Sequence, residues 1–143
     1  MTLRFLFDEC VSLPSFDQLC EHLKGSTPAV ELAHVIQWDL AGKRDEEWVP
    51  AIADQGWIVI SADRGRGGLG RGQKLPHLCL VNRVTLIALS KAIHHQKSAE
   101  KLQSILAAWP QILKASHAAR GTRFTLRYGR NNKLLLKRFK SKS

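Results

Sequence analysis

Long hydrophobic runs and paired cysteines are both missing from this sequence of 143 residues. No apolar run approaches the roughly 20 residues that a membrane-spanning helix needs, so the sequence predicts no membrane contact. The N-terminal apolar stretch is short and ends in Asp8 and Glu9, which predicts no secretion signal. The three cysteines, at positions 10, 20 and 79, are an odd number without CxxC spacing. This argues against a disulfide scaffold or a cysteine-rich zinc site and favours reduced thiols in a cytoplasm.

Acidic residues are almost absent from the second half of the chain. Residues 64–143 contain 18 Lys and Arg but one acid, Glu100, a balance of 18 − 1 = +17. Residues 1–63 contain 4 basic and 11 acidic residues, a balance of 4 − 11 = −7. A basic half can be a solvated, solubilising surface, but so lopsided a balance favours a polyanionic partner, most commonly nucleic acid.

The apolar residues that are present alternate between strand and helix patterns. Hydrophobic residues make up 44% of the chain, enough for the core of one domain. Four short apolar runs predict strands, at Leu3–Phe7, Ala29–Ile36, Trp57–Ile60 and Val84–Leu89. Helical spacing predicts helices from Pro14 to Leu23, from Asp45 to a stop at Gly56, over Leu75–Val81 and over Ser98–Ala115. This alternation predicts an α/β fold with a parallel sheet that is covered by helices on both faces.

The basic C-terminal end predicts a β-hairpin, with strands at Phe124–Tyr128 and Leu134–Phe139. We therefore expect one domain over residues 1–143, with an α/β core at 1–115 and a basic hairpin and tail at 120–143. Apolar and polar residues alternate along the first strand of this hairpin, which predicts one apolar face that packs on the sheet domain. The opposite face, with Arg123 and Arg127, would point outward and guide an RNA backbone. The alternative is a solubilising tail.

Carboxylates follow two of the predicted strands. Asp8 and Glu9 come directly after the first strand and Asp63 after the third, while Asp45 lies in the connection leading into the helix before the third strand. In parallel sheets the functional crevice lies at the carboxyl ends of the strands. Gathered carboxylates repel one another unless a cation is present, and hard oxygen ligands suit Mg²⁺ or Mn²⁺. Such a metal can activate water against a phosphodiester, as in many nucleases.

Each acid also has a structural interpretation. Asp45 can be a helix N-cap, and Asp63 can begin a turn. Glu46 and Glu47 fit the first turn of a helix, where acids offset the helix dipole, and for these two we favour that role. Asp8 is the hardest to explain structurally, because an acid at the end of a buried strand is costly to desolvate.

The loop at residues 64–74 is rich in glycine and arginine. Its glycines formally match the GxGxxG dinucleotide pattern, but no clear helix follows and no acid lies about 20 residues on. Two interpretations remain open, a phosphate-contacting loop and a plain surface loop. In the first, the nucleic-acid contacts would come from Arg64, Arg66, Arg71 and Lys74.

Several segments together resemble one known family. Leu3–Phe7 with Asp8-Glu9, the run Asp45-Glu46-Glu47-Trp48 and the run from Gly56 through Ser61-Ala62-Asp63-Arg64 are similar to PIN-like domains. They look most like the compact group associated with VapC-type toxins. Further similar segments are Lys74-Leu75-Pro76 with Cys79, Val84 to Ser90, and Trp109-Pro110.

The resemblance implies a three-layer PIN-like fold with a central, mainly parallel sheet, followed by the C-terminal hairpin. It implies an Mg²⁺- or Mn²⁺-dependent endoribonuclease that acts as the toxin of a VapBC-like pair, with RNA as substrate, a cognate antitoxin as partner and a homodimer possible. Carried over by motif, Asp8, Asp45 and Asp63 would be catalytic metal ligands, with Glu9 as a further ligand. Ser61 would orient Asp63 or a metal-bound water. Larger PIN nucleases have one more acid, whereas the only acid after Asp63 here is Glu100.

Two other function classes stay open. One is a non-catalytic PIN-like module that binds RNA or an antitoxin. The other is a receiver-like phosphoacceptor domain, which would use Asp63 as acceptor and would need a lysine after the fifth strand.

Overall fold

The structure is a computed structural model that describes residues 2–26, 28–38, 40, 43–62 and 75–139. Within these residues six strands form one sheet, in the order β2-β1-β3-β4-β5-β6. The strands are β1 (Leu3–Phe7), β2 (Val30–His34), β3 (Trp57–Ser61), β4 (Thr85–Leu89), β5 (Arg123–Tyr128) and β6 (Leu134–Arg138). The α-helices are α1 (Leu13–Leu23), α2 (Asp45–Ile52), α3 (Leu75–Val81), α4 (Lys91–His94) and α5 (Ser98–Ala115), and two short 3₁₀ turns are η1 (Ala53–Gln55) and η2 (Arg130–Asn132).

The sheet is mainly parallel, as the alternation of elements predicts. Strands β1 to β5 pair in parallel, and β6 pairs antiparallel with β5. The expectation that the hairpin packs on the sheet domain needs refinement, because β5 joins the sheet as a further parallel strand through the register Leu86↔Arg123 to Leu89↔Leu126. By pairing with β4, it covers a strand edge that would otherwise expose its hydrogen-bonding groups.

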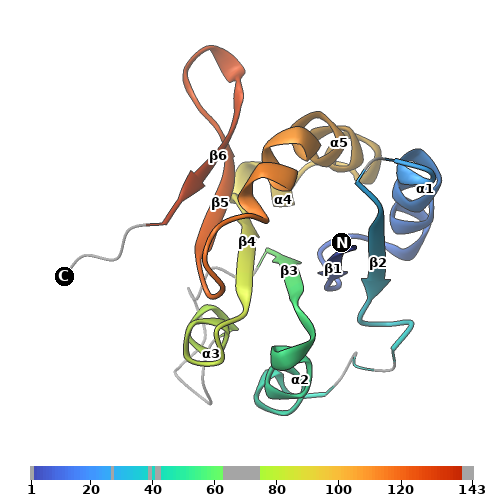
Figure 1. The fold of residues 1–143 in the computed structure, drawn as a ribbon. Helices are drawn as coiled ribbons and strands as arrows, with labels where there is room; N and C mark the ends of the chain where they lie inside the picture. The colour runs from blue at the N-terminus through green and yellow to red at the C-terminus, as the bar shows by residue number, and fades with distance from the viewer. Residues whose placement is uncertain (1, 27, 39, 41–42, 63–74, 140–143) are drawn as a thin grey trace.

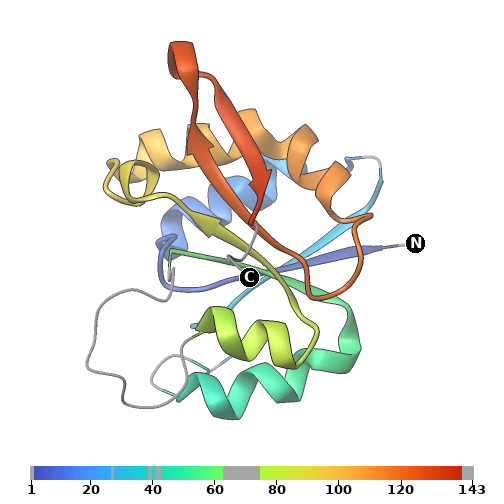
Figure 2. The ribbon, with the colours of Figure 1, turned by 90° about the vertical axis from the view of Figure 1, so that its left-hand side faces the viewer.

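Helices cover both faces of the sheet, so the molecule has three layers (Figures 1 and 2). Helices α1 and α5 pack on one face, together with the short α4, and α2 and α3 pack on the other. The β5–β6 hairpin extends beyond α5 at its turn. Within the described ranges no helix is both long and apolar enough to cross a membrane.

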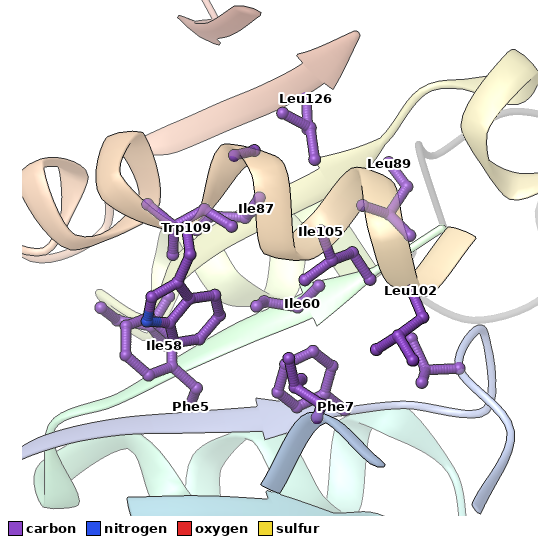
Figure 3. Packing of buried hydrophobic residues seen from close by; sticks show 14 of the residues in the cluster. Phe5, Phe7, Ile58, Ile60, Ile87, Leu89, Leu102, Ile105, Trp109 and Leu126 are labelled. Atoms are coloured by element: carbon purple, nitrogen blue, oxygen red, sulfur yellow. The ribbon is translucent and has the colours of Figure 1, made fainter. Parts of the chain in front are cut away.

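Alternation along the strands divides the core between the two faces. Phe5 and Phe7 of β1 face α1 and α5, whereas Leu6 between them faces α2 and α3. Figure 3 shows the first of these cores, in which the indole of Trp109 from α5 packs on Phe5 with ring centroids 5.0 Å apart. Because helices cover both faces of the sheet, β1, β3 and β4 are mostly apolar, and their polar residues, Arg4, Ser61 and Thr85, lie at or next to a strand end.

Some element boundaries differ from the predicted ones. Strand β2 ends at His34 rather than Ile36, because the chain turns there: the Trp38 amide donates to the carbonyl of His34 at 3.2 Å. The short helix α4 was not predicted. Ser90 caps it by accepting from the Ile93 amide at 3.4 Å.

Candidate functional site

Asp8 lies at the topological switch point of the sheet. In the order 2-1-3-4-5 the connections from β1 diverge to opposite sides, and ligands of such folds bind outside the carboxyl ends of the strands at that point. Asp8 directly follows β1, and its amide donates to the carbonyl of Ile60 in β3 at 3.2 Å. Ser61, the last residue of β3, therefore lies beside it.

Both carboxylate oxygens of Asp8 accept hydrogen bonds. The Cys10 amide donates to Oδ1 at 2.8 Å, and the hydroxyl of the fully buried Ser61 donates to Oδ2. The sequence analysis expected Ser61 to orient Asp63 or a water, so its contact with Asp8 is an addition to that expectation. Charge-assisted bonds of this kind fix the orientation of a half-buried carboxylate.

The loop that carries Asp8 is held from two further elements. His34, at the end of β2, accepts from the Ile36 amide at Nδ1 (3.1 Å), so its proton is on Nε2, which donates to the carbonyl of Val11 at 2.7 Å. Lys101 of α5 donates from Nζ to the carbonyl of Cys10 at 2.7 Å. Strand β2 and helix α5 thus clamp the backbone between Asp8 and Val11, which we call the Asp8 loop.

His34 and Lys101 were not among the residues singled out from the sequence. Lys101 is 91 positions from the Cys10 carbonyl that it contacts. In the sequence of α5 it looks like an ordinary charged surface residue. For His34 a weak signal exists, a polar residue within the apolar strand predicted at Ala29–Ile36. Neither residue belongs to a local motif, so only the fold reveals their role.

Cys10 is not suited to nucleophilic chemistry at neutral pH. Burial raises the pKa of its thiol well above the ordinary cysteine value, and the neighbouring carboxylate of Asp8 raises it further, against a smaller opposing effect of Lys101. The thiol sulfur lies 3.8 Å from the carbonyl of Ile60. Cys10 therefore has the properties of a small packing residue.

Asp45 lies at the start of α2. It is the first residue of the helix, after the N-cap position Arg44, so the N-cap interpretation of Asp45 is wrong. Its Oδ1 accepts from the indole Nε1 of Trp48 at 3.0 Å. Because α2 leads to the start of β3, its own start lies towards the carboxyl edge of the sheet, where Asp8 also lies.

The acids beside Asp45 fit the interpretation that the sequence favoured. Glu46 and Glu47 lie in the first turn of α2, and Glu46 pairs with Arg44 at 3.3 Å. Acids at this position offset the helix dipole.

The donor chemistry of Asp8 fits a hard divalent cation, because each carboxylate oxygen can accept more than the one bond described. Glu9 is exposed beside it. In the part of the chain that the structure describes, however, no three His, Cys, Asp or Glu side chains come together in a group that could hold a metal ion. A metal site at Asp8 would therefore need ligands from elsewhere. The predicted ligand Asp63 lies outside the described residues, and so do the predicted nucleic-acid contacts Arg64, Arg66, Arg71 and Lys74.

The two arginines of β5 share the strand face that points away from the core, but their surroundings differ. The guanidinium of Arg123 lies over the ring of Phe139, 4.0 Å from its centroid. Arg127 is exposed and pairs in register with Leu135. Between them Phe124 and Leu126 point into the core, as the alternation predicts.

One comparison with known proteins finds a match to part of the chain. Residues 3–66 match the model of a family described as PIN like domain. The match runs from β1 to just beyond β3 and so includes Asp8, Asp45 and Ser61. No curated protein and no solved structure matches the chain.

Proposed function

Because residues 3–66 have the sequence of a PIN-like domain, which supports the nuclease-type superfamily, we propose that this protein is a metal-dependent endoribonuclease. The observation that carries the proposal is the carboxylate of Asp8 at the switch point, held on both oxygens. A carboxylate with a fixed orientation is what a hydrolytic metal site requires.

In this proposal the residues of the chain have distinct roles. Asp8 would hold Mg²⁺ or Mn²⁺ with Asp63, and Ser61 orients Asp8. Asp45 and Glu9 would have to move closer to complete the ligand set, because the described acids form no group of three that could hold a metal ion. The bound metal would polarise a phosphoryl oxygen and lower the pKa of a water. Lys101 and His34 hold the Asp8 loop in place, and the basic strand β5 directs the RNA backbone by its charge.

The finer proposal is a toxin of the VapBC type that acts in the cytoplasm and is inhibited by a cognate antitoxin. It is supported by the resemblance of the motifs and by the +17 balance of residues 64–143, which an acidic antitoxin segment could neutralise in competition with RNA. Induced expression should arrest bacterial growth with the wild-type chain and not with Asp8→Asn.

The proposed activity is tested by exchanging Asp8 for asparagine. Asp8→Asn removes a charged ligand but keeps the size of the side chain. Its amide oxygen can still accept from the Cys10 amide, and the Ser61 hydroxyl can rotate to accept from the new NH2 group, so the variant should fold and lose at least about a hundredfold in cleavage rate. We would measure cleavage of structured RNA with Mg²⁺ or Mn²⁺, and in EDTA. Cleavage should stop in EDTA and return with added metal.

The matched control is Asp17→Asn, an exposed acid on α1 that should cleave as wild type does. If Asp8→Asn also cleaves at the wild-type rate, Asp8 is structural and the proposal fails. If the wild-type chain binds RNA but never cleaves it, the non-catalytic module is the correct alternative.

The receiver-like alternative shares the strand order 2-1-3-4-5. A receiver needs a lysine after the fifth strand, whereas Gly129 and Arg130 follow β5 in this chain. The chemistry at this strand end therefore favours the nuclease.

A further inference from the structure

A hollow lies at the opposite edge of the sheet from Asp8. Its volume is about 410 Å³, within the range of small-ligand sites. It is formed at the amino ends of β1, β3 and β4, where Arg4, Trp57 and Thr85 line it. Two further arginines, Arg83 and Arg120, complete the lining from the turn before β4 and the connection before β5.

Two of these arginines contact the same short turn. Arg4 donates from Nη1 to the carbonyl of Gln55 at 3.1 Å, and Arg120 donates from Nη2 to the carbonyl of Ala53. Both carbonyls belong to η1, between α2 and β3. Arg4 also lies over the indole of Trp57, 5.5 Å from the ring centroid. The two guanidinium groups are therefore fixed on one side of the hollow.

The backbone holds Arg83 close to the segment that carries Arg120. Gly121 has φ +88°, and a Cβ at this position would come within 3.2 Å of the Cα of Arg83. Arg83 itself has φ +57°, which a non-glycine residue rarely adopts. The Gly121 amide also donates to Thr85 Oγ1 at 3.3 Å. The close approach requires glycine at position 121 and brings a second and a third arginine together.

The lining of the hollow is strongly cationic. Among the described residues that line it, three are arginines and none is acidic. Glu31 pairs with Arg4 at 3.1 Å, but both side chains of this ion pair are partly exposed to solvent, so it screens Arg4 only weakly. Each guanidinium has five N–H donors, and the contacts with η1 use few of them.

We propose that this hollow, the arginine pocket, binds a phosphate group. Guanidinium forks bind phosphate oxygens in pairs, and three of them from separate elements around one concave site match the charge and the donors that a phosphate needs. The phosphate belongs to a free nucleotide or to the backbone of an RNA strand, which present the same chemistry. This inference is independent of the proposed nuclease activity, because it concerns the other edge of the sheet.

The structural alternative is that Arg4 and Arg120 serve only to satisfy the carbonyls of η1. In that case their replacement changes stability but leaves phosphate binding untouched. Arg83 separates the two interpretations, because it lines the pocket, whereas the described hydrogen bonds to the η1 carbonyls come from Arg4 and Arg120.

The test is calorimetric titration of the full chain in EDTA, so that no metal-dependent cleavage occurs. One arm uses AMP with adenosine as its unphosphorylated control, and the other uses tetra-adenylate RNA without terminal phosphates. Arg83→Gln and Arg120→Gln should each weaken binding about tenfold, the usual effect of losing a charged hydrogen bond. Arg130→Gln, an exposed arginine at the hairpin turn, is the matched control and should change nothing.

The outcomes are distinct. Binding of AMP but not adenosine, lost in both pocket variants, supports a free nucleotide, and binding of the RNA alone with the same losses supports the strand backbone. Shifts of the Gly121 and Gly56 amide NMR signals on titration place the ligand at this edge, since both glycines lie at the pocket. If neither probe binds at millimolar concentration, or if Arg83→Gln binds as wild type does, the arginine pocket is not a phosphate site.

Discussion

At the scale of single residues, the pair of Asp8 and Ser61 links strand packing to chemistry. Ser61 is buried because β3 is buried along its whole length, and a buried hydroxyl needs a partner. Asp8 supplies that partner at the exact place where β1 and β3 both end. The same bond that stabilises the fold thereby orients the candidate ligand.

Removal of this hydroxyl should therefore affect both stability and activity. Ser61→Ala leaves the half-buried Oδ2 of Asp8 without its serine donor, which should cost about 1–3 kcal/mol of unfolding free energy. Urea denaturation measures the stability, and RNA cleavage should also slow. Ser26→Ala, whose hydroxyl makes only an exposed contact, should change the stability by less than about 0.5 kcal/mol. Equal losses in the two variants would contradict the role assigned to Ser61.

At the scale of elements, helix α5 supports two separate parts of the sheet. Near its start, Lys101 reaches the Asp8 loop, and near its end, Gln111 reaches β6. The helix buries one side against β1, β3 and β4 between these contacts. Polar residues of α5 thus form hydrogen bonds with both the Asp8 loop and the edge strand β6.

The contact of α5 with the Asp8 loop gives a prediction for Lys101. Lys101→Met keeps an aliphatic chain but removes the donor to the Cys10 carbonyl, so the loop should open more often. We expect faster hydrogen exchange of the Val11 amide and about a tenfold loss of cleavage, with little change in overall stability. Lys114→Met, an exposed lysine on the same helix, is the control. Unchanged exchange at Val11 in Lys101→Met would show that the loop does not depend on this contact.

The contact with β6 gives a prediction for Gln111. Its side-chain amide donates to the Leu134 carbonyl at 3.1 Å and accepts from the Leu136 amide at 3.0 Å, as a neighbouring strand would. Gln111→Leu should cost about 1–2 kcal/mol for two hydrogen bonds and speed hydrogen exchange at Leu136. Gln103→Leu, at an exposed position of the same helix, should do neither. If the Leu136 amide of Gln111→Leu exchanges as slowly as in the wild-type chain, Gln111 does not stabilise the edge strand β6.

At the scale of the whole molecule, charge is divided between the two halves of one sheet. Eleven of the twelve acids lie in the sequence up to Asp63, which forms β1 to β3, and the basic excess lies in the part that contains β4 to β6. Because β3 and β4 are neighbours, the acidic and basic halves meet within one domain. In the proposed function, an RNA bound by the basic half would lie beside the half that carries Asp8.

This arrangement predicts how RNA binding depends on salt. Arg127 and Lys137 are exposed on the outer face of the hairpin, whereas Arg123 is engaged with Phe139. Replacing both Arg127 and Lys137 by Gln should lower the slope of log affinity against log salt by about 1.4, since each contact with a single-stranded phosphate contributes about 0.7.

The control for this prediction is a variant with Gln at Lys24 and Lys43, two exposed lysines of the acidic half. It should keep the wild-type slope. A slope unchanged in the hairpin variant would leave the solubilising-tail interpretation as the correct one.

The strands, the main helices and the position of Asp8 at a strand end could all be predicted from the pattern of apolar residues. Apolar runs such as Leu3–Phe7 report burial on both faces, and burial dominates local structure when a strand is central. An acid directly after such a strand, as at Asp8, is unusual enough to be noticed in the sequence alone. The turn after His34 was not predicted, because it is stabilised by two local hydrogen bonds that leave no periodic pattern: the Ile36 amide donates to His34 Nδ1 and the Trp38 amide donates to the His34 carbonyl.

The contacts between residues that lie far apart in the sequence could not be predicted and became known only from the folded structure. Lys101 reaches Cys10 across 91 positions, β5 joins β4 instead of packing on the sheet, and three arginines gather around one hollow. None of these contacts has a period or a motif, because each depends on how separate elements close against one another. Periodicity records which side of an element is buried, whereas the partner on that side is fixed only when the layers pack.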